Sequence, residues 1–283
     1  MGYQFLVPNY LDYLQDFPLQ IMQNMSFEKG HIMNIIAMCL CCTFGYLLYT
    51  VAGRMRKRED LDPYPVYLHC WMITIDTIGT MTFWRLLYLY HTPEQLMNGA
   101  WVFLFFSIGL PVWISMEARS IHHDIKSAVA REQNFGRLVK KGEAVTEQQA
   151  RFWCYGTIAV SFFVNMYALS MLGGIKNCAI FIIWPFTNYV FALWTWRFWE
   201  TRAAETGTRK YQSMALHIVI LIQISLMWIP GLSWYLALTP FLHTVWYYAG
   251  GIAMSALAAY NLYKCDKLPK RDEVLPNGKK PVW

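Results

Sequence analysis

The residue of this 283-residue sequence with the clearest capacity for chemistry is Asp76, which lies inside the long apolar stretch Tyr67–Tyr90. A carboxylate in the hydrocarbon of a membrane costs roughly 3 kcal/mol on insertion scales, so such residues usually have a functional partner. Two kinds of chemistry fit a carboxylate in that position. It can bind a cationic group or a coupling proton, or it can act as the general acid of an enzyme.

Polar side chains of other apolar stretches are expected at the same depth as Asp76. A helix rises about 1.5 Å per residue, and this count brings Asn188 and Gln223 level with Asp76 and Asn165 slightly nearer one surface. Hydrogen bonds between membrane helices are the ordinary explanation for such residues, and a shared polar pocket is the functional one. With the neighbours that share their helix faces, the predicted substrate-binding residues are Asp76, Thr80, Asn165, Trp184, Asn188 and Gln223.

The elements that must position these residues are membrane helices. The chain is 56% hydrophobic and 17% aromatic, with a mean hydropathy of +0.25, which is too apolar for a soluble domain of this size. Each apolar stretch is close to the ~20 residues that cross a bilayer. The fold class predicted is an all-α bundle of seven transmembrane helices, at about 31–53, 66–90, 94–116, 152–173, 178–199, 212–236 and 240–263.

The basic residues orient this bundle. Of the 24 lysines and arginines, 21 fall on one side of the predicted spans, and the positive side of a membrane protein is cytoplasmic. The N-terminus is therefore expected outside and the C-terminus inside, in a multi-pass protein of the cell membrane or a eukaryotic endomembrane. The predicted parts are an extracytoplasmic interfacial segment (1–30), the membrane domain (31–263) with a cytoplasmic helical loop (117–151), and a basic cytoplasmic tail (264–283).

The net charge of +6 is explained by this topology and by attraction to anionic lipid, so membrane lipid is an expected partner and nucleic acid is not. His122-His123-Asp124 suggests a metal site, but adjacent residues diverge on a helix, and a solvated loop face is the favoured interpretation. His69 and His217, with two more histidines at the opposite ends of the spans, suggest a di-haem protein. These residues lie at span boundaries, so we expect no cofactor and no metal.

Two resemblances to known families can be stated. Three spans, a central fourth and three more resemble the layout of SWEET sugar transporters and of PnuC-type vitamin transporters, and Trp184-Pro-Phe-Thr-Asn188 resembles the Trp-x3-Asn element of the latter. The aromatic-rich seven-span plan is similar to fungal membrane terpene cyclases, but their early Trp-Glu pair and the Asp of their last span have no counterpart here. Neither resemblance assigns the chain to a family.

The sequence therefore favours a membrane transporter of a small organic solute, with Asp76 as the binding carboxylate. Two alternatives stay open. One is a membrane-embedded enzyme of the cyclase or isomerase type with Asp76 as general acid, and the other is a receptor or the membrane-anchor subunit of a larger complex. Whether the protein is an enzyme, and whether it forms a homo-oligomer, is not decided by these residues.

Overall fold

The computed structural model describes residues 8–60, 62–140, 142–270, 273–275 and 277–283. Parts of the predicted N-terminal segment (1–30) and basic tail (264–283) therefore lie outside the described residues. Within the described chain the fold is all-helical, as predicted. The α-helices are α1 (Pro8–Asn24), α2 (Ile32–Glu59), α3 (Val66–Leu89), α4 (Pro93–Gln95), α5 (Trp101–Lys126), α6 (Ala128–Phe135), α7 (Glu147–Met171), α8 (Ile180–Thr206), α9 (Met214–Trp228), α10 (Trp234–Leu238) and α11 (Val245–Lys267).

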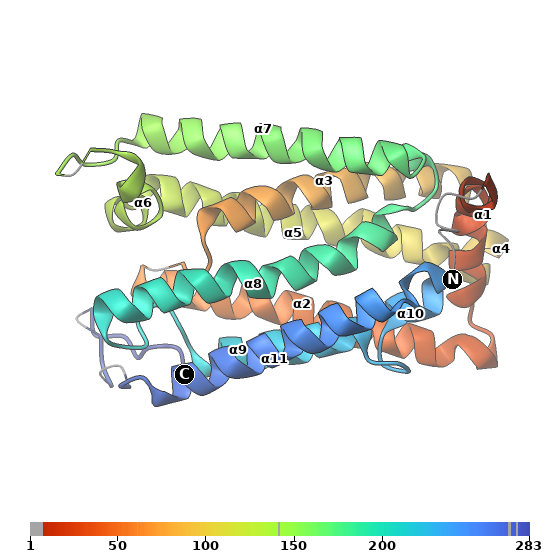
Figure 1. The fold of residues 1–283 in the computed structure, drawn as a ribbon. Helices are drawn as coiled ribbons and strands as arrows, with labels where there is room; N and C mark the ends of the chain where they lie inside the picture. The colour runs from red at the N-terminus through yellow and green to blue at the C-terminus, as the bar shows by residue number, and fades with distance from the viewer. Residues whose placement is uncertain (1–7, 61, 141, 271–272, 276) are drawn as a thin grey trace.

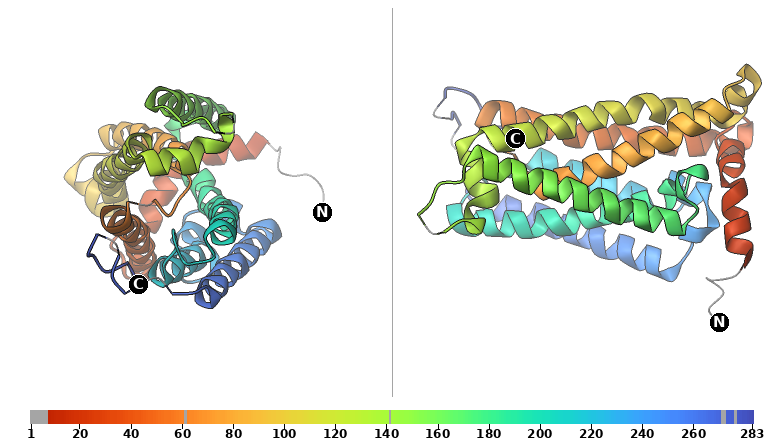
Figure 2. Two further views of the ribbon diagram at one scale, coloured as in Figure 1. Left: turned by 90° about the vertical axis from the view of Figure 1, so that its left-hand side faces the viewer. Right: turned by 90° about the horizontal axis from the view of Figure 1, so that it is seen from above.

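The long helices run side by side along one axis (Figure 1). α3 packs against α5 on one side and α7 on another, while α9 packs between α2 and α11. α7 lies at the outside of the bundle, and α1 crosses one end of it at a steep angle to the other helices (Figure 2). In both figures α1 lies at one end of the bundle, and the C-terminal end of α11 lies at the other.

Two helix starts form as their sequences indicate. Thr92 accepts a hydrogen bond from the backbone N–H of Gln95, and Gln95 in turn accepts one from the backbone N–H of Thr92. Thr146 and Gln149 make the same reciprocal pair at the start of α7. Each pair satisfies two donors that a helix terminus leaves open, which fixes where the helix begins.

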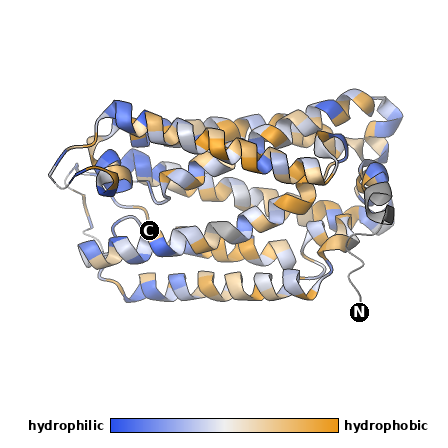
Figure 3. Cartoon of the chain, turned by 45° about the horizontal axis from the view of Figure 1, so that its top comes forward, coloured by the Kyte–Doolittle hydropathy of each residue, from blue (hydrophilic) through white to orange (hydrophobic). Residues whose placement is uncertain are grey.

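Three helical stretches among the described residues are long and apolar enough to cross a membrane: Lys29–Glu59, Pro93–Lys126 and Glu147–Met171. Hydrophobic residues dominate the middle of the bundle, and hydrophilic residues gather at the end that carries α6 (Figure 3). α7 exposes large apolar side chains along its length, including Phe152, Phe163 and Tyr167. An exposed apolar face on this scale suits contact with lipid rather than with water.

The structure corrects the extent of two predicted spans. The stretch 212–236 is not one helix, because α9 ends at Trp228, where Ile229 is extended and Pro230 lacks the N–H that a further turn needs. Ser233 then caps the short helix α10. The third span was predicted to end at 116, whereas α5 continues to Lys126 and carries ten further residues of the loop predicted at 117–151.

The entry to α5 contains a sharp bend. A π-helical segment, Leu96–Ala100, joins α4 to α5, and Gly99 within it has φ +106°. A Cβ at Gly99 would lie 1.9 Å from the carbonyl oxygen of Met22 in α1. The position therefore requires glycine for two reasons, its backbone conformation and the close approach of α1.

Candidate functional site

A cavity surrounds Asp76 in the middle of the bundle. Its walls come from α2, α3, α5, α8, α9 and α10 and from Tyr64 in the loop before α3. The centre of a water molecule can occupy about 50 Å³ of it. Because each water needs roughly 10–15 Å³ by that measure, the cavity holds a few waters, and a larger guest requires side chains to move.

Four of the six predicted binding residues line this cavity: Asp76, Trp184, Asn188 and Gln223. Trp184 and Asn188 are one turn apart on α8 and face the cavity together, as their spacing predicts. Asp76 and Gln223 enter from α3 and α9. The depth count along the helices thus places side chains from three separate helices around one space.

The other two predicted residues lie outside the cavity lining. Asn165 of α7 is buried and donates a hydrogen bond of 3.0 Å to the Thr74 hydroxyl of α3. Thr80 donates to the backbone carbonyl of Asp76 at 2.8 Å, within its own helix. Both contacts are of the kind that membrane helices use to hold backbone and neighbouring helices together.

Asp76 is a buried carboxylate without a protein hydrogen-bond donor. Its side chain is 1% exposed, and neither oxygen has a hydrogen-bond partner among the described residues. Asn188 and Gln223, the donors expected from the sequence, are turned elsewhere: Asn188 donates to the Trp184 carbonyl at 3.1 Å and Gln223 to the Cys41 sulfur at 3.7 Å. A buried carboxylate left open in this way is expected to hold a proton or a cation.

Aromatic rings form most of the remaining wall. Tyr49, Tyr64, Phe106, Trp113, Trp184, Trp234 and Tyr235 all line the cavity. Phe106 stacks on Trp234 with 5.7 Å between ring centroids and lies 5.3 Å from Trp184. Phe83, near the last residues of α3, and Phe181, in the first turn of α8, extend this cluster. Aromatic faces attract cations, and they suit a positively charged or planar guest.

A buried polar network adjoins the cavity at Tyr49, on the side of the predicted cytoplasm. Tyr49 lines the cavity and donates its hydroxyl to Glu117 of α5. The second oxygen of Glu117 contacts His69 Nδ1. His69 Nε2 lies 3.2 Å from Asp62 in the loop before α3. Glu117, His69 and Asp62 are each at most 4% exposed, so their charges must be balanced within the network.

Asp62 holds the loop between α2 and α3 in place through an ion pair and a hydrogen bond to the backbone. Its carboxylate lies 2.8 Å from the Arg56 guanidinium and accepts a 3.1 Å hydrogen bond from the Tyr64 backbone N–H. Burial by itself would raise the pKa of Asp62, but His69 and Arg56 outweigh it and lower that pKa to about 2. Asp62 is therefore ionised at neutral pH, and Trp199 of α8 fastens the same loop by donating to the Pro63 carbonyl at 2.7 Å.

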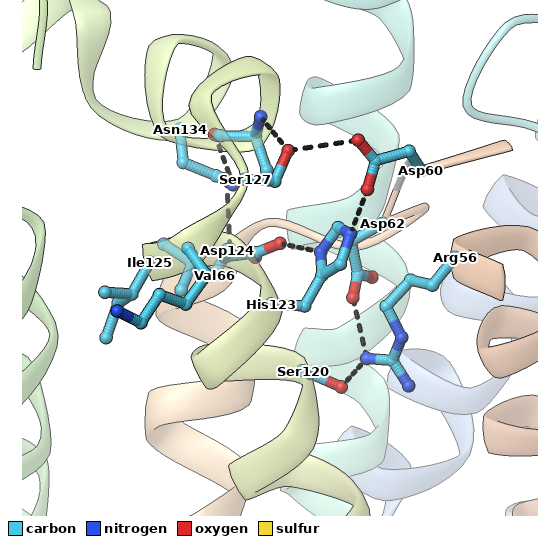
Figure 4. A network of polar contacts seen from close by, with 12 residues as sticks. Arg56, Asp60, Asp62, Val66, Ser120, His123, Asp124, Ile125, Ser127 and Asn134 are labelled. Carbon is cyan, nitrogen blue, oxygen red and sulfur yellow. Dashed lines mark hydrogen bonds and ion pairs between the residues drawn. The ribbon is translucent and has the colours of Figure 1, made fainter. Parts of the chain in front are cut away.

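A second histidine continues the polar network towards the surface (Figure 4). His123 Nε2 lies 2.8 Å from Asp60, and Nδ1 lies 3.1 Å from Asp124. His122 is exposed, as predicted for a solvated face, but Asp124 is fully buried, so that prediction does not hold for Asp124. Ligand atoms of Asp62, His123 and Asp124 lie within 4.8 Å of one another, close enough to share a metal ion, although Arg56 already pairs with Asp62.

The sequence interpretation missed this network for a definable reason. The position of His69 near the end of a predicted span indicates a boundary histidine, whereas its side chain is 2% exposed and lies between two carboxylates. His69 and Asp76 are seven residues apart and so share a face of α3, which is a signal present in the sequence. Glu117 was missed because the predicted span ended one residue before it.

Comparisons with known proteins assign no family to the chain. No protein-family model matches it. Searches of curated proteins and of solved structures find no significant match either.

Proposed function

We propose that this protein is a multi-pass membrane protein of seven spans that transports a small organic cation bound at Asp76. The observation that carries the proposal is the pairing of an unpartnered buried carboxylate with an aromatic wall. A carboxylate in a site of low polarity attracts a cation more strongly than it does in water. Aromatic faces add roughly 0.5–2 kcal/mol of cation–π attraction to that contact.

The surroundings of the cavity support transport rather than simple binding. Aromatic rings line one part of the cavity, and Tyr49, which contacts the polar network, lines another, so a guest would lie between groups of different chemistry. Pro111 and Pro185 lie within the helices α5 and α8 that contribute to the walls. A proline removes a backbone hydrogen bond and gives a helix a place to bend. Bending at these positions would open the cavity on one side at a time.

Uptake by reconstituted protein tests the proposal. Purified protein is screened for thermal stabilisation by tetramethylammonium, choline, guanidinium and N-methylpyridinium, and the cation that stabilises it is then offered in radiolabelled form to proteoliposomes. Uptake above that of empty vesicles is expected for the wild type and for Asn165→Ala, whose side chain lies outside the cavity. Asp76→Asn should fold and show no uptake. Equal uptake by Asp76→Asn would refute the role of Asp76.

A membrane-embedded enzyme is the second candidate, favoured by the small size of the cavity. Nearly all lining side chains are buried, and a closed site of this kind excludes water from a reactive intermediate. In that case Asp76 acts as general acid and the rings stabilise a developing cation. The discriminating result is a chemically altered product after incubation with protein in detergent, where transport cannot be observed.

A further inference from the structure

Two adjacent segments of titratable side chains lead from the Asp76 cavity to the surface of the α2–α3 loop. The first segment begins at Tyr49, which lines the cavity and donates its hydroxyl to Glu117. From Glu117 it passes through His69 to Asp62. Binding a cation at Asp76 requires none of these contacts, so the network has a role that the proposed function leaves open.

Carboxylates and histidines alternate along the series that the two segments form. His69 lies between Glu117 and Asp62, with one ring nitrogen directed at each. His123 likewise lies between Asp124 and Asp60, at 3.1 and 2.8 Å. An imidazole can take up a proton at one nitrogen and release another from its second nitrogen. Histidine between two acceptors is therefore the side chain best suited to pass a proton onward.

One end of the series is exposed to solvent and the other adjoins the cavity. The Asp60 side chain is 67% exposed. The nearest polar atoms of Asp62, His123 and Asp124 lie within 4.8 Å of one another, a separation that a single water molecule can bridge between the two histidine segments. At the cavity end, a space of about 50 Å³ for water centres separates Tyr49 from Asp76. That space holds a few waters, and one such water is able to bridge a hydroxyl and a carboxylate.

We propose that these side chains form a proton pathway between the predicted cytoplasmic surface at Asp60 and the carboxylate of Asp76. At each step one O–H or N–H bond forms as its neighbour breaks, and the last O–H bond forms on Asp76. The proposal rests on the proposed function and adds the coupling ion to it. Because one carboxylate holds either a proton or an organic cation, a proton arriving from this side releases the bound cation.

The network is enclosed by a small set of other ionisable groups. Arg56 pairs with Asp62 and also contacts Ser120 of α5. Tyr64 packs edge-on against the His69 ring at 5.8 Å between centroids. Cys70 of α3 and Cys154 of α7 lie beside each other on the far side of α3. The ionisable groups along the pathway and around its cavity end are, by element, Cys41, Cys42, Tyr46, Tyr49 and Arg56 (α2), Asp60, Asp62 and Tyr64 (loop), His69 and Asp76 (α3), Glu117, His123 and Asp124 (α5), and Tyr235 (α10).

Such a network also stabilises the fold. The test therefore needs a measurement that would stay the same if the variants only lowered the stability of the protein. The measurement is the rate at which Asp76 takes up a proton after a rapid drop in pH. It is followed in the full-length protein by time-resolved infrared absorption of the protonated carboxyl C=O. The Asp76 band is identified by its absence in Asp76→Asn, and no organic ligand is present.

Tyr49→Phe is the decisive variant, because it removes one oxygen from the pathway and leaves the ring in the cavity wall. We expect protonation of Asp76 to slow by about a hundredfold or more, the lower end of what a positioned proton donor contributes. Glu117→Gln should slow it similarly. Tyr46→Phe is the matched control, since Tyr46 lies one turn away on α2 and donates instead to the Gly109 carbonyl at 3.2 Å. Its rate should equal that of the wild type.

Three results would overturn the pathway. The first is an unchanged rate in Tyr49→Phe, and the second is equal slowing in Tyr49→Phe and Tyr46→Phe, which would indicate a loosened fold. The third is the absence of any pH-dependent band that Asp76→Asn removes. If Glu117→Gln does not fold, the two tyrosine variants decide the question alone. Failure of the organic cations to bind would reject the proposed function and leave this infrared result standing.

Discussion

Two neighbouring glycines of α11 give the sharpest prediction for the packing of the bundle. A Cβ at Gly251 would lie 2.2 Å from Cγ of Trp228 in α9, whereas the nearest atoms to a Cβ at Gly250 belong to the Tyr189 ring at 3.5 Å. Ordinary contact begins near 3.4 Å, so Gly251→Ala must displace the indole by about 1.2 Å. That movement would also strain the 2.9 Å hydrogen bond from Trp228 to Ser255.

The expected magnitudes follow from three contributions. Overpacking lowers the free energy of unfolding by about 1–3 kcal/mol, and the strained hydrogen bond lowers it by about 1 kcal/mol more. Alanine raises it by about 1 kcal/mol, because alanine is a better helix former than glycine. Gly251→Ala should therefore destabilise the protein by about 1–3 kcal/mol. Gly250→Ala keeps only the helix-forming gain and should be neutral or slightly more stable.

Thermal unfolding in one detergent, followed by intrinsic tryptophan fluorescence, compares the two variants. Membrane proteins often unfold irreversibly, so the order of the midpoints at a fixed heating rate is the relevant result. The expected order is Gly251→Ala lowest, with Gly250→Ala at or above the wild type. Equal midpoints for the two variants would refute the packing of α11 against α9.

Two further predictions concern the ends of the bundle. The pKa of Asp62, about 2, is below its ordinary value of 3.8, so its stabilisation of roughly 2 kcal/mol is complete above about pH 4 and is lost as the pH falls towards 2. Asp62→Asn should be less stable at neutral pH and should flatten that part of a pH–stability curve, and an unchanged curve would contradict the network. Gly99→Ala places a Cβ 1.9 Å from a backbone oxygen of α1 at φ +106°. It should prevent recovery of folded protein in size-exclusion chromatography, and wild-type yield would contradict the bend.

The residues that line the cavity were predicted better from the sequence than the contacts that surround it. Asp76, Asn188 and Gln223 converge because the long helices run nearly straight along one axis, so that a count of rise along each helix gives a comparable depth. The same count could not say which way a side chain turns. Asn165 is at a similar depth, but it faces Thr74 between α3 and α7.

The contacts within the polar network could not be predicted from the sequence, for a different reason. Its contacts join residues far apart in the chain, such as Tyr49 with Glu117 and Trp199 with Pro63. Periodicity within one helix carries no information about such partners. Hydropathy also ended the third span at 116 and so placed Glu117 in a loop, where an acidic residue needs no explanation.

Direct binding of an organic cation to the cavity is the most direct test of the central claim. Trp113, Trp184 and Trp234 line the cavity, so their fluorescence reports on a guest during titration with tetramethylammonium, choline, guanidinium or N-methylpyridinium. We predict saturable binding of at least one cation to the wild type and to Asn165→Ala, a variant of a buried polar residue outside the cavity lining. Asp76→Asn should weaken that binding by about tenfold or more, which corresponds to about 1.4 kcal/mol. Equal affinity in Asp76→Asn, or no binding of any cation to the wild type, would contradict the account.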